Sequence, residues 1–205
     1  MSTRREVLQM GIAVTVLPLD ATATATARAA PSADAGWGEP VALYKAIYDT
    51  RFAASRAFGE RMAARGVDTA ATTTGDITGL WFDTLYPQWQ KGAAAIAGLT
   101  ARGPLFCLEQ LAGDHGMRVV FRAQHSSSSA GAVRHEIEGA GIVVDAARRV
   151  ATDSDWVSVV SDVIGRYPRT AAPNASVQVQ TARPALQVPE DEVLYSWVIA
   201  PVVRS

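Results

Sequence analysis

Apolar, strand-like segments alternate with amphipathic, helix-like segments over residues 41–124, and this alternation constrains the fold of the chain most. Short runs rich in Val, Ile, Ala and Tyr are separated by longer stretches whose apolar residues recur every three or four positions. The predicted strands cover residues 41–48, 67–74, 93–99 and 117–124. The predicted helices cover residues 51–65, a segment that starts at Ile77 and is broken by Pro87, and residues 105–115. Strands joined in sequence through helices favour a parallel sheet with right-handed crossovers.

The second half of the chain continues with less regular spacing. The Ser-rich segment 126–131 is predicted to be a flexible loop, and residues 133–138 a further strand. Apolar residues at helical spacing between Trp156 and Tyr167 predict an amphipathic helix. Residues 176–182 and 193–200 read as two strands that pair with each other and add an antiparallel edge. We therefore expect residues 41–205 to form a single α/β domain with a mostly parallel, doubly wound sheet of Rossmann-like or flavodoxin-like order.

The N-terminus carries an export pattern. Arg4 and Arg5 precede an apolar run, Met10 to Leu19, and an Ala/Thr tract continues to Ala30. This pattern resembles a twin-arginine signal peptide, which implies export of the folded protein by the twin-arginine translocase and a periplasmic or secreted destination. The apolar run is about half the roughly 20 residues that a membrane span needs, so we expect no stable span. On this interpretation residues 1–30 are cleaved and residues 31–40 form a flexible leader.

Composition excludes several classes of function. The chain has 19 basic and 20 acidic residues and no basic stripe, so a nucleic-acid partner is not expected. Cys107 is the only cysteine, which excludes an intramolecular disulfide, a Cys-ligated iron–sulfur cluster and c-type haem attachment. Its apolar neighbours predict that Cys107 is a small buried side chain. The sequence contains neither a P-loop nor a G-x-S-x-G nucleophile elbow.

Candidate functional residues follow the predicted strands of the first half. Parallel sheets bind ligands at the carboxyl ends of their strands, because loops and helix N-termini converge there. Two arginines, two aspartates, a threonine and a histidine fall at these ends, and we expect them to share one rim: Asp49, Arg51, Asp76, Thr100, Arg102 and His125.

Each rim residue has a chemical role and a plainer alternative. Arg51 and Arg102 are expected to grip a carboxylate or phosphate, and His125, oriented by Asp49 or Asp76, to exchange protons. Trp81 is expected to supply an apolar wall. In the plainer interpretation Asp49 and Arg51 form an ordinary ion pair, and Arg102 is a solvated loop residue. Asp76, another candidate ligand-binding residue, is alternatively a helix N-cap.

These features support two classes of function. The first is a non-catalytic periplasmic module that binds a small, anionic ligand, or that serves as an accessory to a periplasmic redox partner protein. An accessory protein is expected to expose an apolar patch around Trp37, Phe82, Tyr86 and Trp89. The alternative is a hydrolase-type or lyase-type enzyme that uses the same His/Arg/Asp rim.

Overall fold

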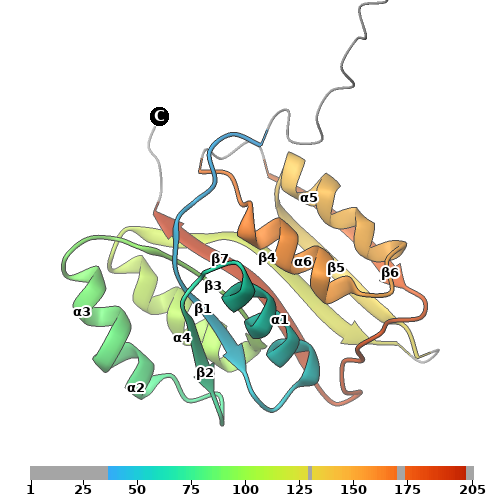
Figure 1. Cartoon of the computed structure of the whole chain (residues 1–205), viewed down its shortest axis with the longest axis horizontal. Coiled ribbons are helices and arrows are strands. Elements are labelled where there is room, and N and C mark those ends of the chain that lie inside the picture. The colour runs from blue at the N-terminus through green and yellow to red at the C-terminus, as the bar shows by residue number, and fades with distance from the viewer. Residues whose placement is uncertain (1–36, 129–130, 170–173, 202–205) are drawn as a thin grey trace, which may run out of the picture. The chain divides into compact units, whose positions relative to one another are not determined.

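Seven strands form one mixed sheet in the order β2-β1-β3-β7-β4-β5-β6 (Figure 1). The computed structural model describes residues 37–128, 131–169 and 174–201, which all belong to one compact unit, residues 33–205. The strands are β1 (Leu43–Asp49), β2 (Thr69–Thr72), β3 (Ala95–Ala101), β4 (Met117–Ser127), β5 (Val133–Ala140), β6 (Asn174–Thr181) and β7 (Val193–Pro201).

The prediction of a mostly parallel, doubly wound sheet was wrong. Only β2, β1 and β3 are parallel neighbours, and every other adjacent pair of strands is antiparallel. The two C-terminal strands do not pair with each other. Strand β7 lies in the middle of the sheet between β3 and β4, whereas β6 is the edge strand beside β5.

The side chains of β7 explain its central position. Seven consecutive residues, Leu194 to Ala200, are buried, so the strand is covered on both faces. Trp197 fills the face toward α4, and its ring passes directly over Gly98 of β3. A Cβ at Gly98 would lie 2.4 Å from Trp197 Cζ2 and 2.8 Å from the carbonyl oxygen of Ile47, closer than such atoms approach in proteins. The glycine therefore makes room for the tryptophan.

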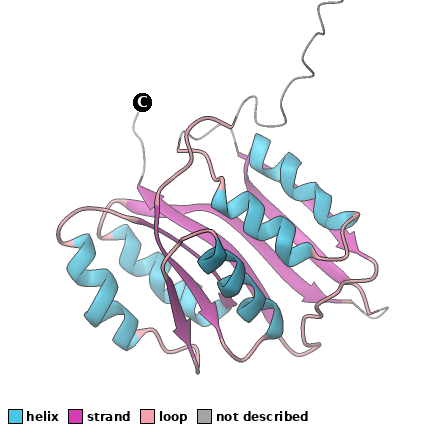
Figure 2. Cartoon of the chain, viewed as in Figure 1, coloured by secondary structure: helices cyan, strands magenta, loops and turns pink. Residues whose placement is uncertain are grey.

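Helices cover both faces of the sheet (Figure 2). Helices α1, α6 and α5 lie side by side on one face, over a core that includes Phe58, Phe121 and Trp156. The other face carries α2, η1, α3 and α4, over a core that includes Leu108 and Trp197. The helices are α1 (Ala53–Ala64), α2 (Thr78–Leu80), the π-helix η1 (Trp81–Leu85), α3 (Tyr86–Trp89), α4 (Arg102–Gly113), α5 (Gly141–Ala147), the 3-10 helix η2 (Arg148–Ala151) and α6 (Trp156–Gly165).

Among the described elements, none covers β5 on the sheet face that carries α4, and β5 has exposed residues on that face. Along β5, Arg134 and Glu138 are exposed, whereas Val133, His135 and Ile137 are buried against the opposite face. This alternation is typical of an antiparallel strand with one solvated face. The open face borders the candidate site described below.

Several predicted elements are present with shifted ends. Helices α1, α4 and α6 lie where the apolar periodicity places them. The helix from Thr78 is not broken at Pro87, because a π-helical turn precedes the proline and α3 continues to Trp89. Strand β4 extends through Ser127 into the predicted loop 126–131, of which residues 129 and 130 lie outside the described part of the chain.

The predicted signal peptide, residues 1–30, lies outside the described residues, as do residues 31–36 of the predicted leader. The end of that leader is packed: Trp37 is buried under the guanidinium of Arg166, with 4.9 Å from Cζ to the ring centroid. In the described part of the chain, no helix has the length and apolar character needed to cross a membrane.

Candidate functional site

The carboxyl ends of β1 and β3 form the topological switch point of the sheet. From β1 the chain enters α1 on one face, and from β3 it enters α4 on the opposite face. In open α/β sheets, two connections that leave neighbouring strands toward opposite faces form a crevice at the strand ends, and ligands bind in this crevice. Although only three strands are parallel, this part of the sheet retains the geometry on which the rim prediction depends.

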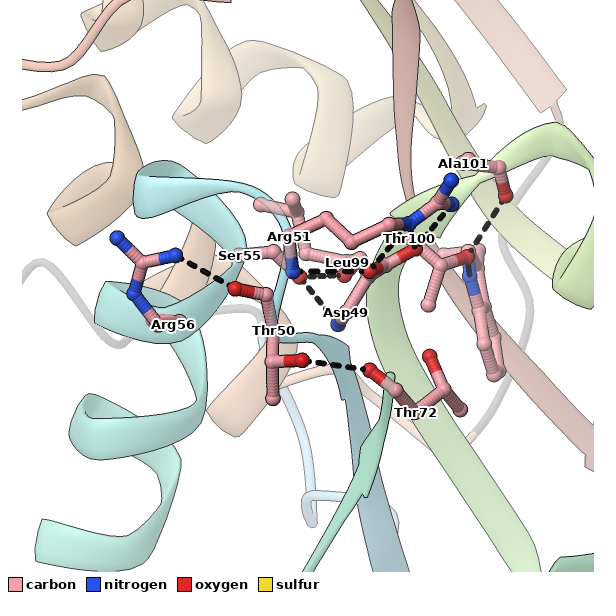
Figure 3. A network of polar contacts seen from close by, with 10 residues as sticks. Asp49, Thr50, Arg51, Ser55, Arg56, Thr72, Leu99, Thr100 and Ala101 are labelled. Carbon is pink, nitrogen blue, oxygen red and sulfur yellow. Dashed lines mark hydrogen bonds and ion pairs between the residues drawn. The ribbon is translucent and has the colours of Figure 1, made fainter. Parts of the chain in front are cut away.

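Asp49 and Arg51 lie at the carboxyl end of β1 (Figure 3). The Asp49 carboxylate is fully buried, and the Arg51 guanidinium lies across it. Arg51 Nη2 donates to Asp49 Oδ2 at 2.7 Å and Nε donates to Oδ1 at 3.0 Å, while the backbone N–H of Arg51 also donates to Oδ1 at 3.1 Å. The pKa of Arg51 is raised, mainly by its hydrogen bond to Asp49, with a smaller contribution from the negative charge of Glu192.

Hydroxyl groups hold the ends of the three parallel strands together (Figure 3). Ser55 of α1 accepts a hydrogen bond from Asp49 N at 2.7 Å and donates to the carbonyl of Leu99 in β3. Thr50 Oγ1 donates to the carbonyl of Thr72 in β2 at 3.2 Å. These bonds fix the backbone from which Asp49 and Arg51 project.

Two threonines lie on the same sheet face as Asp49. Thr100 is buried and donates to the Ala101 carbonyl at 2.9 Å, while its oxygen accepts from Trp197 Nε1 at 3.2 Å. Its bonding capacity is therefore largely used within the fold. Thr72, paired in register with Asp49, is also buried, but its Oγ1 has no partner among the described residues. A buried hydroxyl without a partner is uncommon in folded proteins.

The first turn of α4 lies next to this ion pair and carries Arg102. A Cβ placed on Gly75 would lie 3.3 Å from Arg51 Nη2 and 3.7 Å from Pro104 Cδ, so the β2–α2 loop, Arg51 and α4 meet here. Arg102 is exposed and forms no ion pair or hydrogen bond with any other described residue. No side chain caps the N-terminus of α4. The N-terminal end of the helix and the Arg102 cation both favour an anion.

Asp76 makes a local hydrogen bond next to α2, although the N-cap residue of that helix is Ile77 and not Asp76 as predicted. Its Oδ1 accepts a hydrogen bond from the backbone N–H of Thr78 at 2.8 Å, at the start of α2. The pKa of Asp76 is lowered, because its hydrogen bonds with Thr78 favour the carboxylate. Asp76 thus stabilises the turn that leads into α2.

His125 is not brought to the rim. Its ring is completely buried on the opposite face of the sheet, against Trp156 of α6, with ring centroids 4.5 Å apart. His125 Nδ1 lies 2.7 Å from Nδ1 of His135, and His125 Nε2 lies 2.8 Å from Ser196 Oγ. At the far end of this chain, His135 Nε2 lies 2.9 Å from Thr181 Oγ1.

The hydrogen bonds that link these buried side chains fix the tautomer of each histidine. The Thr181 hydroxyl donates to the Val150 carbonyl, so Thr181 Oγ1 must accept from His135 Nε2–H. Nδ1 of a neutral His135 is then the acceptor for His125 Nδ1–H, and His125 Nε2 accepts from the Ser196 hydroxyl. Burial lowers the pKa of His135 to about 4, and that of His125 well below its ordinary value. Both rings are therefore neutral at pH 7 and serve as satisfied core groups.

Trp81 belongs to η1 and lies on the same face of the sheet as α4, where it is part of an aromatic cluster. Its ring centroid is 5.6 Å from that of Trp89 and 5.5 Å from that of Tyr86. Of the four residues in the predicted apolar patch, Phe82 and Tyr86 are exposed, whereas Trp37 and Trp89 are buried. The patch is consequently smaller than the sequence predicts. Cys107, predicted to be buried, is exposed on α4.

A cleft that the sequence did not reveal adjoins Arg102. It has a volume of about 200 Å³ and lies between α4 and the open outer face of the sheet. Besides Arg102, its charged lining consists of Glu109, Arg122, Glu136 and Glu138. The alternation of charged with apolar residues along β4 and β5 was the available signal, but it does not say which helix borders the open face.

Among the residues that the structure describes, no three His, Cys, Asp or Glu side chains come together to hold a metal ion. Comparisons with known proteins add no relative. No protein-family model matches the chain, and neither the curated proteins nor the solved structures contain a significant match.

Proposed function

We propose that this protein is an exported binding protein for a small ligand with an anionic group, and that the anion binds at the carboxyl ends of β1 and β3. The observation that carries the proposal is Arg102, an exposed cation without a partner in the described chain, on the uncapped first turn of α4 at the switch point of the sheet. A guanidinium beside free backbone N–H groups binds carboxylates and phosphates well.

Arg51 has a supporting role in this proposal. Its charge is compensated by the buried Asp49, so it adds little net attraction for an anion. The pair holds the guanidinium rigidly beside Gly75 and Pro104, and its Nη1 has no hydrogen-bond partner among the described residues. Arg51 therefore offers two positioned N–H donors close to the first turn of α4.

The enzyme alternative has weaker support. It requires an acid–base group at the rim, and the histidine assigned to that role is buried on the other face of the sheet. A binding role needs only the arginines and backbone donors that the rim provides.

Isothermal titration calorimetry with pentanoate and inorganic phosphate tests the proposal. We expect saturable binding of at least one anion, and an Arg102→Gln variant should bind roughly tenfold to a hundredfold more weakly, as expected for loss of a charge-assisted hydrogen bond. Lys91→Gln is the control, since it removes an exposed cation just before β3, at the end of the strand opposite to Arg102. Equal losses in the two variants, or no binding of either anion, would contradict the proposal.

Export by the twin-arginine translocase is part of the same proposal, and the Arg4–Arg5 pair followed by the apolar run supports it. Replacing Arg4 and Arg5 together by Lys should retain the precursor in the cytoplasm. Cell fractionation followed by mass spectrometry of the mature N-terminus measures this. Unchanged export of the variant would refute the assignment of the pathway.

A further inference from the structure

The cleft beside α4 has an apolar wall and a polar floor. Leu105 and Phe106 of α4 form the wall, and the Phe106 ring is 54% exposed. Tyr195 of β7 lies on the floor, where its hydroxyl donates to Gln124 Oε1 at 3.1 Å. Exposure of a large aromatic ring beside a concave polar surface is unfavourable in water, and a ligand chain lying against the ring would remove that cost.

The charges in the cleft are separated along its length. Glu109 and Arg122 neutralise each other, with 2.7 Å between Oε2 and Nη2. The uncompensated charges are then Arg102, at the rim end, and two carboxylates of β5, Glu136 and Glu138. Neither carboxylate forms an ion pair with another described residue, although Glu136 accepts a hydrogen bond of 3.4 Å from Gln178.

The two glutamates are positioned to act together. They are two residues apart on one strand, so their side chains leave the same face about 7 Å apart. Glu138 lies directly opposite Arg122 in the β4–β5 register. Arg122 Nε is buried and has no hydrogen-bond partner in the described chain.

We infer that the cleft binds a small zwitterionic molecule of amino-acid type, with its carboxylate on Arg102 and its ammonium group between Glu136 and Glu138. The inference rests on the proposed function, because the carboxylate takes the anion position at Arg102. The charged side chains that line the cleft, two arginines and three glutamates, carry one more negative than positive charge. This excess disfavours a second anionic group on a ligand held at Arg102 and favours a cationic one. A volume of about 200 Å³ is below the range of drug-sized pockets and suits a molecule of this size.

The test compares three probes that have the same five-carbon chain: 5-aminopentanoate, pentanoate and pentylamine. Each is titrated calorimetrically into the full-length protein and its variants. We expect 5-aminopentanoate to bind at least tenfold more tightly than pentanoate. The double variant Glu136→Gln/Glu138→Gln should abolish that preference while retaining the affinity for pentanoate. Arg102→Gln should weaken both carboxylate probes.

The control is Glu60→Gln, which removes an exposed carboxylate from α1 on the other face of the sheet. All substituted side chains have exposed surface, and unchanged thermal unfolding confirms that the variants fold. Equal binding of pentanoate and 5-aminopentanoate, both sensitive to Arg102→Gln, would overturn this inference and leave the proposed function standing. A preference for 5-aminopentanoate that survives the double variant would also overturn it. Failure of both carboxylates to bind would overturn this inference, and failure of inorganic phosphate to bind as well would refute the proposed function.

Discussion

Acid should destabilise this protein through its buried pair of histidines. In the folded state burial lowers the pKa of His135 to about 4, against 6.5 in the unfolded chain. As the pH falls below 6.5 the unfolded chain takes up a proton that folded His135 does not, so the free energy of unfolding decreases until the pH reaches about 4. His135 alone should lower the free energy of unfolding by about 2 kcal/mol between about pH 7.5 and about pH 5.

His125 should extend this loss to lower pH, since its pKa is also lowered well below the ordinary value. The hydrogen-bond chain gives an independent reason. If both rings carried two protons, His125 Nδ1–H and His135 Nδ1–H would face each other across 2.7 Å, where no acceptor remains. The folded state therefore resists double protonation.

Urea unfolding at a series of pH values measures the effect. The double variant His125→Gln/His135→Gln should be less stable at neutral pH, yet its stability should change less with pH than that of the natural sequence. The variant His115→Gln, at a half-buried ring in the aromatic cluster, should keep the full pH dependence. Equal pH dependence of the natural protein and the double variant would refute the assignment to the buried pair.

Two further substitutions test the packing and the ion pair at the strand ends. Gly98→Ala should destabilise the fold by roughly 3 kcal/mol, because the new methyl meets the Trp197 ring. The control Gly113→Ala should be neutral or slightly stabilising, because it lies in an open helical position. Thermal unfolding compares the two variants, and equal melting temperatures would contradict the packing argument. Arg51→Gln should lower the free energy of unfolding by about 2 kcal/mol, because it leaves the buried Asp49 carboxylate with fewer hydrogen-bond donors. Urea unfolding measures this loss, and an unchanged midpoint would show that water replaces the guanidinium.

The local pattern of the sequence predicted the elements around the rim. Helical periodicity located α1 and α4, and the placement of Arg102 at the start of a helix follows from Gly103 and Pro104 in its first turn. Asp49 and Arg51 follow β1, as expected. These results depend on residues near each other in the chain, where the pattern of apolar side chains is informative.

The pairing of the strands could not be predicted from the local sequence pattern in the same way. The apolar run from Leu194 to Ala200 does not alternate, which is typical of a strand buried on both faces, and this signal favours a central position over the predicted edge. Nothing in the run itself identifies β3 and β4 as its neighbours. The position of His125 could have been predicted from the sequence. It is two residues beyond Ala123 and four beyond Phe121, so once β4 continues past Gln124, all three side chains share the buried face.

The central claim is that Arg102 and the adjoining cleft bind one ligand, and amide NMR spectra recorded during titration with 5-aminopentanoate test it most directly. Saturable shifts should concentrate on the backbone amides of Arg102 and Gly103 and on β5 from Glu136 to Glu138. Shifts confined to other parts of the protein, or the absence of saturable shifts, would contradict the claim.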